Sequence, residues 1–197
     1  MAKKKKGGAS FIVSIICLVL SVLLVATFFM PTFAEKTEDG YKYSGVVLTQ
    51  AFFMDEDDAK EAGVNALNVV KYNEEEREDF ARSIAAYTYL NNEENAGFKI
   101  AVVANWFVVI AGVAGIILSV LALLNKGNGL GLIIAALVGT VAGVALLICA
   151  SNFANYIYDT ALIKDLATLS VGAGTWIAMI SAVVTTGAAV AGKVMKK

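Results

Sequence analysis

The chain has 197 residues, of which 58% are hydrophobic and 17% are charged, and it contains no histidine. A composition this apolar excludes an ordinary soluble domain, which needs more polar groups to cover its surface. The net charge of −1 balances 16 basic against 17 acidic residues. We therefore expect no nucleic-acid partner, because nucleic-acid binding needs an excess of basic residues.

Four apolar runs are each long enough to cross a membrane as a helix. We predict transmembrane helices at residues 11–30, 101–124, 130–150 and 171–192, because about 20 helical residues cross the hydrocarbon core. None of these runs contains Asp, Glu, Lys, Arg or His. Intramembrane ionisable groups usually mark proton relays and ion sites, so the sequence argues against a proton-coupled pump or a secondary transporter.

Charge is segregated between the segments that join these runs. Residues 1–10, 125–129 and 193–197 carry lysine and no acid, whereas all the acids lie in residues 31–100 and 151–170. The lysines in question are Lys3, Lys4, Lys5, Lys6, Lys126, Lys193, Lys196 and Lys197. Because basic residues are retained in the cytoplasm during insertion, we predict a multi-pass protein of the plasma (cytoplasmic) membrane with both termini cytoplasmic.

Aromatic residues favour the same orientation. They gather near the predicted outer ends of the helices, at Phe28, Phe29, Trp106, Phe153, Tyr156 and Trp176. Amphipathic rings prefer the membrane interface, so we take Trp106, Tyr156 and Trp176 as interface anchors.

The first apolar run has a second interpretation, as a secretory signal. Pro31 breaks the helix, and Thr32-Phe33-Ala34 has small residues where a signal peptidase would cleave after Ala34. The apolar run is longer than the 7 to 15 residues of a usual signal core. We therefore favour an uncleaved helix.

Residues 31–100 form the long outer segment, for which we predict a small acidic domain of mixed α/β structure. Residues 41–53 are rich in aromatic and β-branched side chains and predict one or two strands. Residues 57–72 and 73–90 have helical patterns. We expect this unit to pack on the outer ends of the helices and on the loop 151–170, because alone it is too small for a substantial core.

Small residues inside the runs predict close helix packing. Residues 125–129 predict a tight cytoplasmic turn between the second and third helices. Small side chains recur at four-residue spacing along the second, third and fourth helices. They are Ala111, Gly115, Gly139, Gly143, Gly174, Ala178 and Ala182. Such faces serve contacts within one bundle, or contacts to a second copy or a membrane-protein partner, and the pattern leaves both open.

No residue pattern indicates catalysis, a metal site or a cofactor. The acidic residues 55–58 do not fit a calcium-binding EF-hand loop, since Ala59 and Lys60 replace a ligand and the turn glycine. Cys17 and Cys149 lie inside predicted helices and suit packing. Hydroxyls at Ser14, Ser21, Ser181, Thr185 and Thr186 are explained by bonds to their own helices.

The order of segments resembles the claudin-like tetraspan membrane proteins, and also small bacterial membrane proteins of unassigned function. The motifs are Tyr43-Ser44-Gly45 after the first helix and Gly172-Ala173-Gly174-Thr175-Trp176 at the start of the fourth. The resemblance implies four antiparallel helices with an outer domain. Residues 31–100 contain neither Trp nor Cys, so the claudin outer-loop signature is missing and no functional residue is carried over.

The sequence therefore predicts an all-α membrane bundle with a small α/β outer domain and a non-enzymatic role. The first hypothesis is a structural, scaffolding or accessory subunit that interacts through its outer domain and its small-residue helix faces. Two alternatives stay open: a channel or carrier for small neutral or lipidic solutes, and a sensor that binds a ligand outside the membrane.

Overall fold

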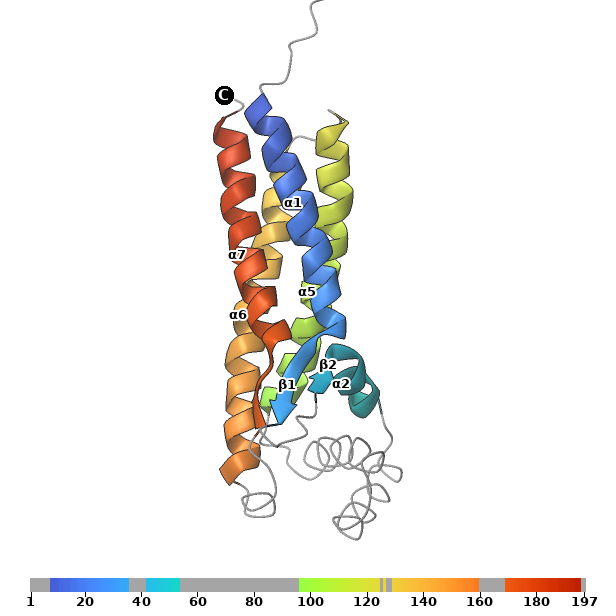
Figure 1. The fold of residues 1–197 in the computed structure, drawn as a ribbon, viewed down its shortest axis with the longest axis vertical. Coiled ribbons are helices and arrows are strands. Elements are labelled where there is room, and N and C mark those ends of the chain that lie inside the picture. Colours follow the sequence, from blue (N-terminus) through green and yellow to red (C-terminus); the bar gives the residue numbers. More distant parts are fainter. Residues whose placement is uncertain are drawn as a thin grey trace, which may run out of the picture.

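The structure is a computed structural model that describes residues 8–35, 42–53, 96–124, 126, 129–159 and 169–195. Within these residues it is a long helical bundle with a small sheet at one end (Figure 1). The elements in chain order are α1 (Gly8–Ala26), the short 3-10 turn η1 (Thr27–Phe29), β1 (Pro31–Glu35), β2 (Lys42–Ser44), α2 (Gly45–Phe52), α5 (Ala96–Leu123), α6 (Leu130–Asp159), β3 (Leu169–Val171) and α7 (Ala173–Val194).

The predicted membrane helices are confirmed in number and position. Within the described residues, four helices are long and apolar enough to cross a membrane, at Phe11–Phe29, Lys99–Leu123, Leu130–Asn152 and Ala173–Val194. Helix α6 continues past its apolar span to Asp159, into residues predicted as a loop. No Gly or Pro stands between Gly143 and Asp159 to stop it.

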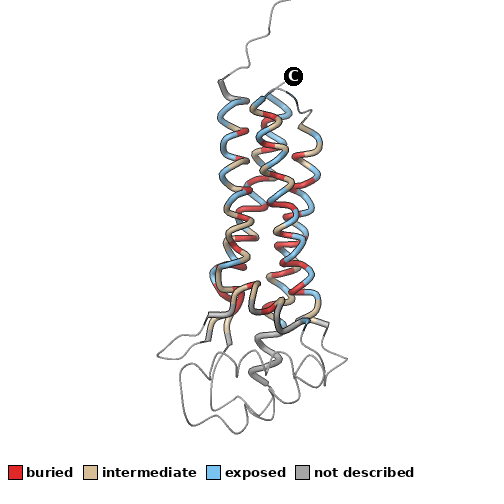
Figure 2. Tube along the Cα trace, turned by 90° about the vertical axis from the view of Figure 1, so that its right-hand side faces the viewer, coloured by how far each residue is buried: buried red, intermediate tan, exposed pale blue. Residues whose placement is uncertain are grey.

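The four long helices form a ring in which α1 neighbours α5 and α7, and α6 neighbours the same two helices on the other side. Buried residues follow each inner face (Figure 2) at alternating spacings of three and four. On α1 they are Ser14, Cys17, Ser21 and Leu24. On α7 they include Ala178, Ala182, Thr185, Ala189 and Gly192. This is the spacing of a coiled-coil seam, and it matches four helices packed side by side.

A three-stranded antiparallel sheet caps one end of the bundle, with strand order β2-β1-β3. Strand β1 leaves the end of α1, and β3 leads directly into α7. Because α1 and α7 are neighbours, these two strands are brought side by side (Phe33 opposite Val171). Of the predicted α/β structure of residues 31–100, the described part contains the strands β1 and β2 and the helix α2.

The prediction of one or two strands over residues 41–53 is largely wrong. Only Lys42–Ser44 is a strand, and Gly45–Phe52 is helix α2. Leu48 is buried in α2, which packs against α5, and the Thr49 hydroxyl donates to the Gly45 carbonyl oxygen at 2.7 Å. Tertiary packing thus overrides the local strand preference of the β-branched residues. The predicted helices 57–72 and 73–90 lie outside the described residues.

Candidate functional site

Residues from distant parts of the sequence meet at two places in the bundle. The first, here called the sheet junction, is formed by Met30, Pro31 and Thr32 against Gly172, Gly174 and Thr175. The second, here called the α1–α5 seam, is formed by Ser21, Leu24 and Val25 of α1 against Gly112 and Gly115 of α5. Ser119 lies one turn further along the same stripe of α5.

The sheet junction is tied by hydrogen bonds that join residues far apart in the chain. The Thr32 carbonyl oxygen accepts from the Gly172 backbone N–H at 2.8 Å and from the Thr175 hydroxyl at 3.1 Å. The Ser170 hydroxyl donates to the Ala34 carbonyl oxygen at 2.9 Å. The Thr32, Phe33 and Thr175 side chains are buried, so these bonds are made where water competes little.

The two glycines of the Gly-x-Gly-x-Trp motif allow this close approach. A methyl group built on Gly172 would lie 2.7 Å from the Pro31 carbonyl carbon, and one on Gly174 would lie 2.8 Å from the Pro31 carbonyl oxygen. Real side chains do not come so near to backbone atoms. Gly174, predicted as part of a helix-packing series, therefore lies against the chain that leaves α1.

The remaining predicted packing residues all lie in the interior of one chain. A methyl group built on Gly139 would meet the Ala111 and Ala182 methyl groups at 3.2 and 3.7 Å, and one on Gly143 would lie 3.1 Å from the Met179 Cα. Ala178 and Ala182 are fully buried, and Gly115 lies directly against the Ser21 hydroxyl. In contrast, nothing lies within 4 Å of a methyl group built on Gly187.

The predicted interface aromatics lie toward the sheet end of the helices. The Phe28 and Trp106 rings are in contact, with centroids 5.1 Å apart and ring planes tilted by 54°. Trp106 and Trp176 are exposed on the outside of the bundle. Tyr156 lies on α6, with its side chain outside the described part. The first residue of α2, Gly45, fits against Phe28 and the Asn105 amide, which attaches α2 to the bundle at the same level.

Some buried polar groups in the bundle have hydrogen-bond partners and others do not. On α7 the Thr185 hydroxyl donates to the Ser181 carbonyl oxygen at 2.7 Å, and the Thr186 hydroxyl lies 2.9 Å from that of Thr140 on α6. On the other side of the bundle the Ser21 hydroxyl, the Ser119 hydroxyl and the Asn105 amide nitrogen are buried without a hydrogen-bond partner.

Sequence reasoning missed Asn105, Gly112 and Ser119. All three stand on one stripe of α5, at the three-and-four spacing shared with Val108 and Gly115. An asparagine within an apolar span is a visible signal, but the partner helix that this stripe faces cannot be read from α5 alone.

Two described lysines, Lys126 and Lys193, lie at the end of the bundle opposite the sheet, whereas Lys42 of β2 and Lys99 of α5 lie toward the sheet. Lys126 follows α5 and Lys193 lies in the last turn of α7, and both are exposed. The other predicted topology residues, Lys3, Lys4, Lys5, Lys6, Lys196 and Lys197, lie outside the described residues.

Among the residues that the structure describes, no group of three or more His, Cys, Asp or Glu side chains could hold a metal ion. Cys17 is a buried free thiol and Cys149 a partly buried one. The acidic residues 55–58 lie outside the described ranges. The described residues of the sheet junction and the α1–α5 seam make packing contacts and hydrogen bonds, and we identify no reacting group among them.

Four apolar, membrane-length helices around a core of small residues place the chain in the class of multi-pass membrane proteins. No protein-family model, curated protein or solved structure matches it. The resemblance to claudin-like tetraspans accordingly stays a hypothesis about layout.

Proposed function

We propose that the chain is a non-enzymatic tetraspan that serves as a structural or accessory subunit of a membrane assembly, with partner contacts made at its sheet-capped end. The observation that supports this most directly is the sheet junction. It fastens the segments that follow α1 and precede α7 to each other and to the bundle. Such a platform gives the described strands β1 and β3 a fixed position at the end of the bundle.

The packing of the small residues limits where a partner protein can bind. Because Gly139, Gly143, Ala178 and Ala182 are used for contacts within one chain, they are not available to a partner helix. The exposed surface of the spans is lined by large apolar side chains such as Ile15, Ile110 and Val183, which suit lipid tails. Partner contacts are therefore best sought at the sheet end.

The proposed orientation places the sheet end outside and the lysine-flanked end in the cytoplasm, with both chain ends on the cytoplasmic side of the plasma membrane. Its support is the exposure of Lys126 and Lys193 at one end and the retention of basic residues inside. Labelling of intact cells with a membrane-impermeant reagent tests it. A cysteine placed at Phe53 reacts under this proposal, and a cysteine placed at Lys126 reacts only after permeabilisation.

A photo-crosslinking amino acid tests the role itself. We would place it at Phe53, which follows α2 and is 74% exposed, and, as the matched control, at Val183, which is 47% exposed on the flank of α7. A discrete protein adduct in native membranes from position 53 and only lipid adducts from position 183 is the expected result. Adducts of the reverse pattern, or only lipid at both positions, would remove the proposal.

A further inference from the structure

The end of the bundle opposite the sheet brings the start of α1 and the end of α7 together. A methyl group built on Gly192 of α7 would lie 2.8 Å from Val13 Cγ1 of α1. One turn deeper in the bundle, Cys17 of α1 and Ala189 of α7 are buried in one apolar cluster. Figure 1 shows α1 beginning and α7 ending side by side. The surface formed by these two helix ends is here called the α1–α7 corner.

Lysines are concentrated in the two chain segments that meet at this corner. Lys193, in the last turn of α7, is exposed. Lysines at residues 3–6 come just before α1, and Lys196 and Lys197 follow α7; all of these lie outside the described residues. Chain length limits their distance from the corner whatever structure they take, because two extended residues span at most about 7 Å. All the lysines of this end except Lys126 therefore belong to the α1–α7 corner or to the chain next to it.

No carboxylate side chain nearby in the sequence balances this positive charge. Residues 1–34, 95–158 and 166–197 contain neither Asp nor Glu. The described acids Glu35, at the end of β1, and Asp159, at the end of α6, lie at the opposite, sheet-capped end of the bundle (Figure 1). Like charges gathered without counter-charges repel one another. The corner should therefore attract an anion from outside the chain.

The depth of the corner indicates that a lipid headgroup is this anion. Lys193 lies one residue from the end of the apolar span Ala173–Val194, which is the level at which the headgroups of a bilayer begin. The apolar side chains of Phe11, Ile12 and Val194 are exposed at the same end. A lysine at the end of a span keeps its stem on apolar surface and its ammonium group among the headgroups.

We propose that the α1–α7 corner binds an anionic phospholipid, whose phosphate contacts Lys193 and the neighbouring lysines and whose acyl chains lie along the exposed apolar side chains of α1 and α7. Clusters of four to eight basic residues directly beside a transmembrane helix are typical of anionic-lipid binding, and the lysine ammonium is a common phosphate ligand. The proposal does not depend on the role or the orientation proposed above, because the lysines stay at one end of the bundle in either orientation.

Native mass spectrometry of the full chain, offered equal amounts of phosphatidylglycerol and phosphatidylcholine with the same acyl chains, measures the preference. The corner variant leaves residues 3–6 unchanged, so that the lysines that direct insertion of α1 are kept. It carries Lys193→Gln, Lys196→Gln and Lys197→Gln. The matched control makes the same change of charge in the segment that follows α1, with Lys36→Gln, Lys42→Gln and Lys60→Gln.

We expect the unaltered chain and the control to prefer phosphatidylglycerol. The corner variant should lose at least roughly fivefold in affinity for phosphatidylglycerol relative to phosphatidylcholine, because each lysine near the headgroups contributes to the attraction. An equal loss in both variants would overturn the proposal. So would the absence of any lipid preference in the unaltered chain, which is the result expected if the corner binds an acidic protein instead.

A second measurement on the unaltered chain guards against a variant that fails to fold. In phosphatidylcholine bicelles, replacing part of the lipid by phosphatidylglycerol should shift the NMR signal of the Lys193 backbone amide and leave that of the Trp176 indole, at the other end of α7, in place. Inorganic phosphate added without phosphatidylglycerol should not reproduce the shift. An unchanged Lys193 signal, or the same shift with phosphate alone, would contradict a lipid site.

Discussion

Glycines let chain segments approach closely at both the sheet junction and the α1–α5 seam. The two regions differ in whether the buried polar groups near these contacts have hydrogen-bond partners. At the junction, glycines bring backbone against backbone, and the polar groups exposed by that approach are paired, with two donors on the Thr32 carbonyl oxygen. In the seam, glycines again bring helices together, but the Ser21 and Ser119 hydroxyls are left without partners. Buried polar groups are therefore paired at the sheet end and left unpaired in the seam between α1 and α5.

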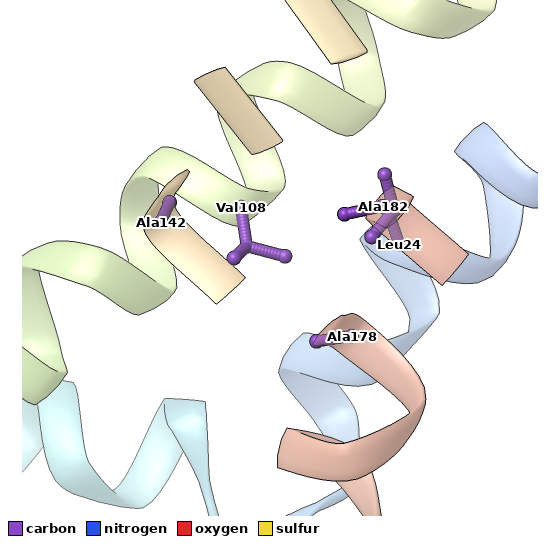
Figure 3. Close-up of a cluster of buried hydrophobic side chains, with 5 residues drawn as sticks. All are labelled: Leu24, Val108, Ala142, Ala178 and Ala182. Carbon is purple, nitrogen blue, oxygen red and sulfur yellow. The ribbon is translucent and has the colours of Figure 1, made fainter. Parts of the chain in front are cut away.

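Removal of α1 should have the largest effect, because both the sheet junction and the α1–α5 seam depend on it. Cleavage after Ala34 would separate α1 and most of β1 from the rest of the chain. It would remove Leu24, which packs in the bundle core with Val108, Ala142, Ala178 and Ala182 (Figure 3), and Thr32 of the junction. We therefore expect α1 to remain attached, and intact-mass measurement of the membrane-extracted protein should give the mass of the chain with residues 1–34 present. A mass lacking them would contradict the packing described for α1.

Substitution of Gly172 by Ala should be the most damaging single change at the junction. The added methyl group would collide with the Pro31 carbonyl group, and overpacking of this kind costs up to about 3 kcal/mol. Gly187→Ala is the matched control, because it meets open space on a helix and should be neutral or stabilising by up to about 1 kcal/mol. Thermal unfolding in mild detergent compares the two, and equal melting temperatures would refute the junction contacts.

Gly112→Ala should disturb the seam to a smaller degree. Its methyl group would lie 2.8 Å from Val25 Cγ2 and 3.0 Å from the Ser21 carbonyl oxygen, so α1 and α5 must separate slightly. We expect a loss of about 2 kcal/mol in the free energy of unfolding, measured by the same assay. Full stability of the variant would mean that α1 and α5 lie further apart at Gly112 than described.

Thr175→Val tests one hydrogen bond of the junction while preserving side-chain shape. The Thr32 carbonyl oxygen keeps its bond from the Gly172 N–H and loses the one from the Thr175 hydroxyl. The expected cost is about 1 kcal/mol. An increase in stability would mean that the hydroxyl is not bonded there.

Ser119→Ala should change the free energy of unfolding only slightly, and the direction of that change is informative. If water binds the Ser119 hydroxyl, its removal loses a bridged hydrogen bond and costs up to about 1 kcal/mol. If the hydroxyl is dry and unpartnered, its removal relieves a desolvation penalty and the protein becomes more stable. Measuring the free energy of unfolding of this variant and of Thr175→Val under the same conditions shows whether stability falls or rises.

Much of the fold followed from local patterns. The apolar runs predicted the four spans, because a membrane-length stretch without charge admits few other structures. The candidate sites were less predictable. Gly174 and Trp176 were singled out by a short motif, but the role of Gly174 depends on Pro31, which is far away in the sequence. The strand preference of residues 45–52 was overridden by the packing of α2 on α5.

By itself, the sequence determined the four segments that can cross a membrane as helices, since the hydrocarbon core accepts only segments whose backbone polar groups bond internally and whose side chains are apolar. Only the tertiary structure decided which small residues face one another. That α1 and α7 are neighbours, that β1 and β3 therefore pair, and that the Ser21 and Ser119 hydroxyls are enclosed without partners are consequences of the order of helices around the ring. Helix order is a long-range property, and it is set by the fit of four surfaces rather than by any one of them.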